Sequence, residues 1–194
     1  MSTLETVAKP RKTSAFKQLM SMHWLMAGCY LVLFTGGTLM INLPEDTPVQ
    51  DAFYNFHKSM GALTMGLLTW RIFILLQVWW RKYTRRLPTL TNEWMKKFAL
   101  HTVLYLLMLA VPLSGFFLSN SYQSGNVPFF GITLPDIFPE NQAVVELARN
   151  LHFWLTYTFL AFIALHGIDQ WKVVRATWRR IVSAIRGKSV SRGG

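Results

Sequence analysis

Five histidines are the residues of this sequence best suited to chemistry, because an imidazole can bind a metal ion or transfer a proton near neutral pH. An ionisable residue inside an apolar segment is costly to keep there and is usually functional. A lone histidine in a helix is more often an ordinary packed side chain, but here all five lie within hydrophobic segments or at their ends. They are His23, His57, His101, His152 and His166.

Four hydrophobic segments carry these histidines. The chain of 194 residues is 52% hydrophobic and 15% charged, whereas a soluble domain has about 25% charged residues. Residues 18–44 hold no charge over 27 positions, and a membrane span needs only about 20. The hydropathy pattern predicts an all-α membrane protein, a four-helix transmembrane bundle within residues 18–170, with spans at about 18–43, 56–80, 98–118 and 150–168. The net charge of +11 then belongs to the membrane edges, and nucleic-acid binding is excluded.

The charges of the loops predict the orientation of the bundle. Of the 20 basic residues, 17 lie before the first span, between the second and third, or after the fourth. The other two loops hold six of the nine acids. Because basic loops stay in the cytoplasm, both termini are expected there, which makes residues 1–17 a cytoplasmic segment and residues 171–194 a basic cytoplasmic tail.

The tail has the pattern of an amphipathic helix. Its apolar residues recur at steps of three or four, and basic residues fill the gaps. The pattern predicts a helix at the membrane interface, lying on an anionic leaflet. A helix that continues the fourth span into solvent explains the first turn equally well. The apolar positions are Trp171, Val174, Trp178, Ile181 and Ile185.

This orientation sorts the histidines into two layers. The outer layer holds His57 and His152, and the inner layer holds His23, His101 and His166. His152 and His166 are 14 residues apart, so on one helix they return to within about 40° of the same face, about 21 Å apart along the axis. The fourth helix therefore presents a histidine to the bundle interior at two levels.

Facing histidines from different helices suit the two axial positions of a haem iron. A zinc site needs three or four ligands close together, and neither layer offers cysteine or a set of carboxylates. The single cysteine, Cys29, also excludes a cysteine-held iron–sulfur cluster and the C-x-x-C-H attachment of a c-type haem. A proton relay would need carboxylates inside the spans, and the spans contain none.

Arg71 is the one basic residue deep in a predicted span. It follows His57 by 14 residues and so shares its face, one layer further in. A buried guanidinium needs an anionic partner, which favours a haem propionate or another bound anion over a side chain that only reaches to the surface. Gly61, one helical turn after His57, leaves room for a cofactor, and Gly28, Gly36, Gly37 and Gly66 also leave room, although close helix packing explains these glycines as well.

Five segments, in this order and spacing, resemble the four-span bacterial cytochrome b561 family over about residues 21–168. They read MHWLM, FHKSMGALTMGLLTWR, HTVLYLLMLAVPLSG, SGNVPFFGITLPD and LHFWLTYTFLAFIALH. The resemblance implies two non-covalent b haems with His23, His57, His152 and His166 as axial ligands. It implies that His101 lies near the inner haem without binding its iron, and that Arg71 lies near the inner haem propionates and the quinone region. The layers alone leave His23 and His101 as equal candidates.

The resemblance also implies a function, which is transmembrane electron transfer in the bacterial inner membrane. The expected partners are membrane lipid and a quinone, with superoxide or an electron-donor protein at the outer face. An alternative is a cytochrome b subunit of a larger dehydrogenase or hydrogenase complex. A third hypothesis, from another class, is a haem-free transporter that carries histidines.

Overall fold

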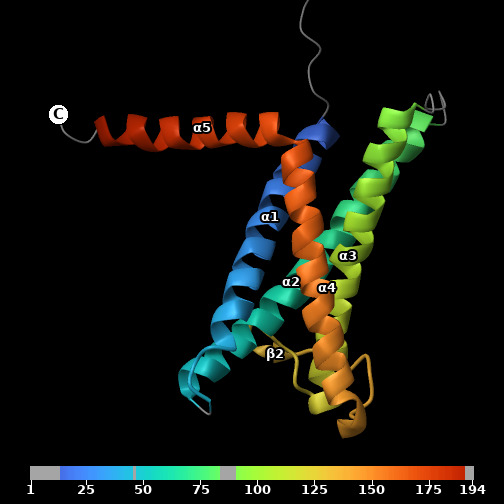
Figure 1. The fold of residues 1–194 in the computed structure, drawn as a ribbon, viewed down its shortest axis with the longest axis vertical. Helices are drawn as coiled ribbons and strands as arrows, with labels where there is room; N and C mark the ends of the chain where they lie inside the picture. The colour runs from blue at the N-terminus through green and yellow to red at the C-terminus, as the bar shows by residue number, and fades with distance from the viewer. Residues whose placement is uncertain (1–13, 46, 84–90, 191–194) are drawn as a thin grey trace, which may run out of the picture.

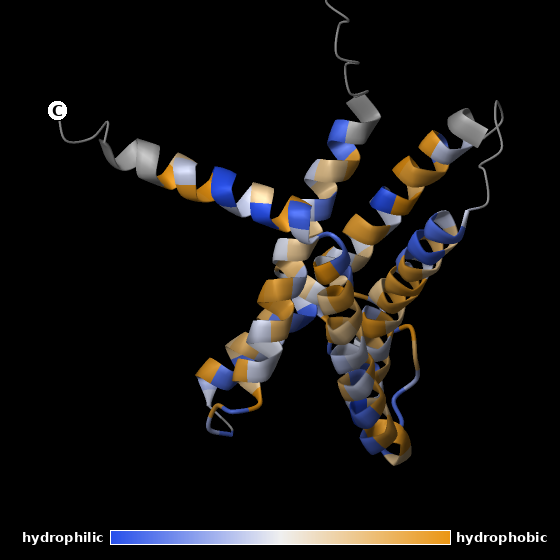
Figure 2. Ribbon diagram, turned by 45° about the horizontal axis from the view of Figure 1, so that its top comes forward, coloured by the Kyte–Doolittle hydropathy of each residue, from blue (hydrophilic) through white to orange (hydrophobic). Residues whose placement is uncertain are grey.

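Four long helices form the bundle in the computed structural model, which describes residues 14–45, 47–83 and 91–190 (Figure 1). They are α1 (Ser14–Met40), α2 (Pro48–Tyr83), α3 (Asn92–Tyr122) and α4 (Val145–Asp169). Each contains a stretch long and apolar enough to cross a membrane, which confirms the predicted four-span helical class (Figure 2). The predicted segment before residue 14, Arg85 and Arg86 between α2 and α3, and the tail from residue 191 lie outside the described residues.

The helices extend beyond the spans predicted from hydropathy. Helix α2 begins at Pro48, eight positions before the predicted span, and proline suits a first helical turn because its missing N–H would have no partner there. Helix α3 begins after Thr91, whose side chain accepts a hydrogen bond from the Trp94 N–H at 3.2 Å. Hydropathy marks only the part of a helix that is apolar, so polar end turns escape it.

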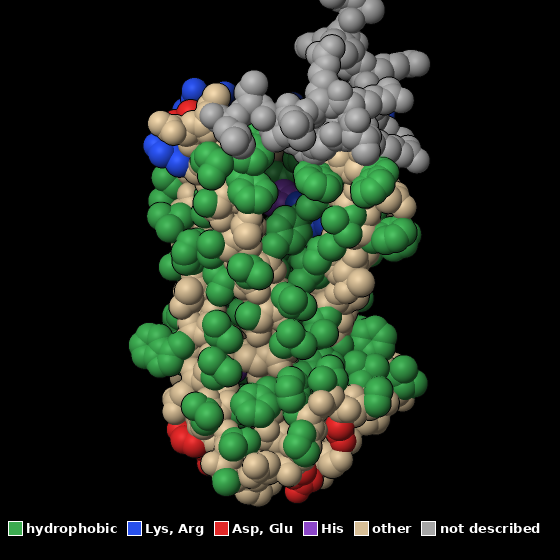
Figure 3. Space-filling model, turned by 90° about the vertical axis from the view of Figure 1, so that its right-hand side faces the viewer, with side chains coloured by type: hydrophobic (Ala, Val, Ile, Leu, Met, Phe, Trp, Pro, Cys, Tyr) green, Lys and Arg blue, Asp and Glu red, His purple; other side chains and the backbone are tan. Residues whose placement is uncertain are grey.

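The bundle consists of two helix pairs, α1 with α2 and α3 with α4. The pairs meet between α2 and α3 and also where α1 faces α4, since the Tyr30 and Phe159 rings lie 5.0 Å apart and the Phe34 and Tyr157 rings lie 5.6 Å apart. Leu104 and Leu107 of α3 join Phe159 in the buried core. Large apolar side chains such as Leu31 and Trp154 remain exposed all round the helices, as expected of a surface that faces lipid (Figure 3).

The outer loop is more ordered than the sequence indicated. It contains a two-stranded antiparallel hairpin, β1 (Pro128–Phe129) with β2 (Ile132–Thr133), and a 3₁₀ turn, η1 (Gln142–Val144), directly before α4. The hairpin turn uses left-handed backbone at Phe130 (φ 46°) and Gly131 (φ 102°). A two-residue strand is too short to give an alternating hydrophobic pattern, so the sequence could not reveal it.

A buried asparagine and an aspartate hold this loop onto the end of α3. Asn120 is fully buried, and its amide donates to Asp136 Oδ1 at 2.7 Å while its oxygen accepts from the Ile137 N–H at 3.0 Å. Asp136 also accepts hydrogen bonds from the Ser124 hydroxyl and the Gly125 N–H. The loop is thereby fixed over the outer end of the bundle.

Asp136→Asn is expected to loosen the outer loop in a pH-dependent way. The hydrogen bonds from Ser124 and Gly125 hold the pKa of Asp136 below its usual range. A depressed pKa means that the ionised group contributes stability above its unfolded pKa of about 3.9, and that this contribution is lost as the pH falls through the lower folded value. Amide hydrogen exchange of residues 124–138 should therefore be faster in the variant than in the wild type at neutral pH. The ratio of the two rates should approach one in acid, and Asp169→Asn at the opposite end of α4 should leave the loop unchanged at every pH.

Candidate functional site

The outer layer brings together the two histidines expected there. The rings of His57 on α2 and His152 on α4 face each other across the bundle, with their centres 6.4 Å apart and their planes at 87°. Both side chains are half-buried, and the Nδ1 atom of His57 is buried without a hydrogen-bond partner. A buried polar atom of this kind needs a bound group to satisfy it.

The inner layer brings together all three of its predicted histidines. The ring centres of His23 on α1 and His166 on α4 lie 6.0 Å apart, with their planes at 76°. His101 on α3 lies closer to His166, at 5.1 Å. The Nδ1 atom of His166 is again buried without a partner. The inner layer therefore holds one pair with the spacing of the outer pair, and one additional ring.

These spacings test whether a metal-centred cofactor fits between the rings. A metal ion bound at about 2 Å by one nitrogen of each of two opposed rings would separate the ring centres by roughly 6 Å. The pairs His57–His152 and His23–His166 have this separation, whereas His101–His166 is shorter. Among the described residues, no three His, Cys, Asp or Glu side chains converge into a metal site of their own, so each pair would supply two ligands.

The hydrogen bonds of His152 assign its proton. The Ser114 hydroxyl has one proton, which it donates to the Val111 carbonyl at 2.7 Å. With the hydroxyl proton donated to that carbonyl, His152 Nδ1, 2.9 Å from the hydroxyl oxygen, is the donor of the second bond. This arrangement favours the tautomer with its proton on Nδ1, which leaves the lone pair of Nε2 for a metal ion. His101 Nδ1 likewise donates to the Lys97 carbonyl at 2.7 Å, so hydrogen bonding alone does not separate ligand from bystander in the inner layer.

Two glycines give the outer histidines their space. A Cβ atom placed on Gly37 of α1 would lie 3.1 Å from Cε1 of His57, and one placed on Gly115 of α3 would lie 3.3 Å from Cε1 of His152. At Gly61, which the sequence suggested as a space-making residue, an added Cβ would meet nothing within 4 Å. Gly37 was among the glycines expected from the sequence to leave room, whereas the approach of Gly115 to His152 was not expected, because it depends on how α3 and α4 pack.

The layers repeat at intervals of seven residues on every helix. Seven residues return a helix to within about 20° of the same face after about 10.5 Å, so each helix presents three levels to the interior. The histidine pairs occupy the inner and outer levels, and a middle level lies between them. From the inner to the outer level, the positions are 23, 30 and 37 on α1, 71, 64 and 57 on α2, 101, 108 and 115 on α3, and 166, 159 and 152 on α4.

The middle level is packed by Tyr30 and Phe159, with Thr64 fully buried beside them on α2. The Tyr30 hydroxyl donates a long hydrogen bond, 3.4 Å, to the Met108 carbonyl. That carbonyl is available because Pro112, four residues later, has no N–H to donate to it. This level was not expected from the sequence, although the seven-residue spacing predicts it.

Arg71 points into the bundle at the inner layer. Its Nε donates to the Tyr105 hydroxyl at 2.8 Å, and its guanidinium carbon lies 5.7 Å from the centre of the Tyr105 ring. It lies within electrostatic range of both His23 and His166. Tyr105 was not expected from the sequence, since a tyrosine in an apolar run has no distinguishing signal. Figure 3 shows a recess near this end of the bundle, in which histidine and Lys or Arg atoms are visible among apolar side chains.

Four spanning helices with histidine pairs stacked along their interior define a multi-pass helical membrane protein of the b-type cytochrome class. Comparison with known proteins gives the same result. The model of the prokaryotic cytochrome b561 family matches residues 17–183, and the chain belongs to this family. Cytochrome b561 homolog 2 of Escherichia coli (strain K12) is 27% identical to it over 157 residues, which cover 76% of this chain and 77% of the relative. The protein is therefore a bacterial membrane protein that binds b-type haem and transfers electrons across the membrane, and the haem-free transporter hypothesis is wrong.

Gly37→Ala is expected to impair the outer haem site, and Gly36→Ala provides the matched control. The new methyl group at position 37 would force the His57 ring to move by a few tenths of an ångström, whereas at position 36 it would meet nothing. Overpacking of this kind costs about 1–3 kcal/mol, which would weaken haem binding at that site between about fivefold and 150-fold. Both variants gain the same helix propensity, so their difference isolates the contact. Haem titration of the apoprotein, followed by absorbance, measures it, and equal affinities in the two variants would contradict the role of Gly37.

Proposed function

We propose that this chain passes electrons through two b haems stacked along the bundle, one at each histidine layer, and exchanges them with the membrane quinone pool. The observation that carries the proposal is the pair of ring spacings, 6.4 Å in the outer layer and 6.0 Å in the inner layer, on one face of α4. In this arrangement His57 and His152 hold the outer haem, and His23 and His166 hold the inner haem.

The protein residues have defined tasks in this proposal. The haem iron supplies the redox chemistry by alternating between its ferrous and ferric states. The pairs His57–His152 and His23–His166 would each hold one haem through two imidazoles, which would keep small molecules from binding to its iron. Ser114 keeps the proton of His152 on Nδ1, away from the metal-binding nitrogen. Tyr30 and Phe159 fill the space between the two layers and exclude water from it.

Arg71, Tyr105 and His101 support a quinone site at the inner layer. The hydrogen bond to Tyr105 uses Nε of Arg71, so the two terminal nitrogens keep their protons for a haem propionate or a quinone carbonyl. His101 is exposed and has Nε2 free, which suits an imidazole that donates or accepts the proton that quinone reduction requires. In this proposal His101 serves the quinone and does not bind iron.

The loop charges support an orientation with both termini in the cytoplasm of a bacterium and the multi-pass chain in its inner membrane. Figure 3 shows Lys and Arg side chains near one end of the apolar surface and Asp and Glu side chains at the other. The inner haem and the quinone site would then lie toward the cytoplasm, and the outer haem toward the periplasm.

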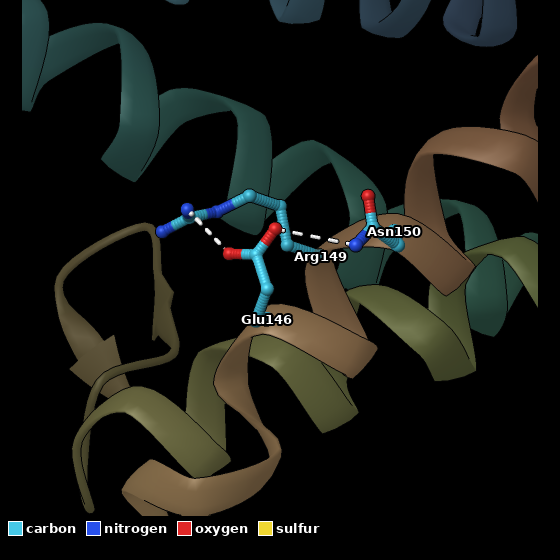
Figure 4. A network of polar contacts seen from close by, with 3 residues as sticks. All are labelled: Glu146, Arg149 and Asn150. Carbon is cyan, nitrogen blue, oxygen red and sulfur yellow. Dashed lines mark hydrogen bonds and ion pairs between the residues drawn. The ribbon is translucent and has the colours of Figure 1, made fainter.

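The outer end offers support for two kinds of electron donor. Lys58, beside His57, donates to the neutral Asn126 amide oxygen at 2.8 Å, whereas Arg149 is paired with the Glu146 carboxylate (Figure 4). The charge of Lys58 would attract an anionic donor such as superoxide.

Alternatively, the chain is the cytochrome b subunit of a larger dehydrogenase or hydrogenase complex. The exposed side chains Phe130 and Ile132 at the hairpin turn favour such a donor protein, and co-purification of a large partner would identify it.

Two b haems per 22.4 kDa chain are expected in a pyridine haemochrome assay. His57→Ala and His23→Ala should each lose one low-spin electron paramagnetic resonance signal, because each removes one axial ligand of a different haem. His101→Ala is the matched control in the inner layer and should keep both signals. A stoichiometry near one would overturn the two-layer arrangement. Loss of a signal in His101→Ala, with both kept in His23→Ala, would exchange the roles assigned to these two residues.

Arg71→Leu is expected to lower the midpoint potential of one of the two haems by tens of millivolts, because a nearby positive charge favours the reduced form. It should also slow reoxidation of the reduced protein by a ubiquinone analogue in stopped-flow measurements. Tyr105→Phe, which removes the hydrogen bond and keeps the charge, should preserve the potential. If neither potential moves in Arg71→Leu, the guanidinium does not act on a haem.

A further inference from the structure

Helix α5 (Trp171–Val190) leaves the bundle across its axis (Figure 1). The change of direction takes place at Gln170, whose N–H donates to the His166 carbonyl at 3.0 Å to end α4. The carbonyl of the same residue accepts from the Val173 and Val174 N–H groups at 2.8 and 3.1 Å to begin α5. Because both helix ends are hydrogen-bonded at one residue, the turn is a defined part of the fold.

The two faces of α5 differ sharply in chemistry. Successive residues turn by about 100°, so six apolar side chains fall within a stripe roughly 100° wide, and the basic side chains lie outside it. Trp171 and Trp178 in this stripe are 61% and 66% exposed, so the protein itself leaves them uncovered. The apolar stripe consists of Trp171, Val174, Trp178, Ile181, Val182 and Ile185, and the basic residues are Lys172, Arg175, Arg179 and Arg180.

We propose that α5 docks on the anionic phospholipid headgroups of the leaflet at this end of the bundle, with its apolar stripe immersed and its basic side chains on the lipid phosphates. A helix that lies across the axis of a spanning bundle runs along the membrane plane, where both faces find a partner at once. Each basic residue at an anionic surface strengthens the docked state by about fivefold. A second copy of α5 packed on the stripe would bring like charges together. This inference concerns a surface and is independent of the number of haems.

The test uses the fact that the chain has a single cysteine, which is buried in α1. In a Cys29→Ala background, single cysteines are placed on the stripe (Val174→Cys, Ile181→Cys) and on the opposite face (Ala176→Cys, Ser183→Cys), and each is spin-labelled. The full chain, with an unchanged haem spectrum, is placed in nanodiscs of either phosphatidylcholine alone or phosphatidylcholine with a third phosphatidylglycerol. Power-saturation electron paramagnetic resonance then measures the accessibility of each label to oxygen and to a water-soluble nickel complex.

In discs with phosphatidylglycerol, the ratio of oxygen to nickel accessibility should be several-fold higher on the stripe than on the opposite face. The difference should shrink in phosphatidylcholine alone, and also in the triple variant Lys172→Gln, Arg175→Gln, Arg179→Gln. Nickel access equal on both faces would mean that α5 projects into water. Stripe labels shielded from both reagents would mean that a protein covers them. Equal immersion in both lipid mixtures would remove the anionic lipid from the proposal, and each of these three results overturns it.

Discussion

This structure depends on one geometric property of the α-helix, which is that residues seven positions apart lie on nearly the same face. A helix that crosses a bilayer has room for three levels spaced by about 10.5 Å, and a residue repeated every seven positions stays on nearly the same face. All four helices place their interior residues on this spacing, so the levels coincide across the bundle. At the first level and at the third, the two histidines of a pair then face each other because the helices share one register. No loop has to position these histidines.

The two histidine levels differ in the residues that lie beside the rings, and these residues give each level a different chemical character. At the outer level Gly37 and Gly115 lie against His57 and His152, so each ring has a glycine rather than a larger side chain beside it. At the inner level the two positions outside the His23–His166 pair are Arg71 on α2 and His101 on α3, a permanent cation and an exposed imidazole. The same scaffold therefore holds one secluded level and one level that can exchange charge and protons with a ligand.

The sequence predicted what depends on local composition and missed what depends on contacts between helices. Four spans and the histidine levels followed from hydropathy, charge and the 14-residue spacing within α4. The hydrogen bonds of Tyr105 and Ser114, and the particular contact of Gly37 with His57, did not follow, because each involves a residue of another helix. His23 and His101 stayed equivalent because both begin outward-running helices at the same depth. The ring spacings, 6.0 Å and 5.1 Å from His166, add to the family resemblance in support of the proposal that His23 is the ligand.

The packed middle level has an electrical consequence. The hydroxyls of Tyr30 and Thr64 there donate to the backbone carbonyls of Met108 and Gly61, and Phe159 has no exchangeable proton. Within the described part of the chain, this level offers no relay along which a proton could accompany an electron from one histidine level to the other. A charge that moves alone between the levels does work against the membrane voltage, up to about 2.3 kcal/mol per 100 mV for a complete crossing. With a haem at each histidine level, as proposed, the membrane voltage would shift the distribution of electrons between the two levels.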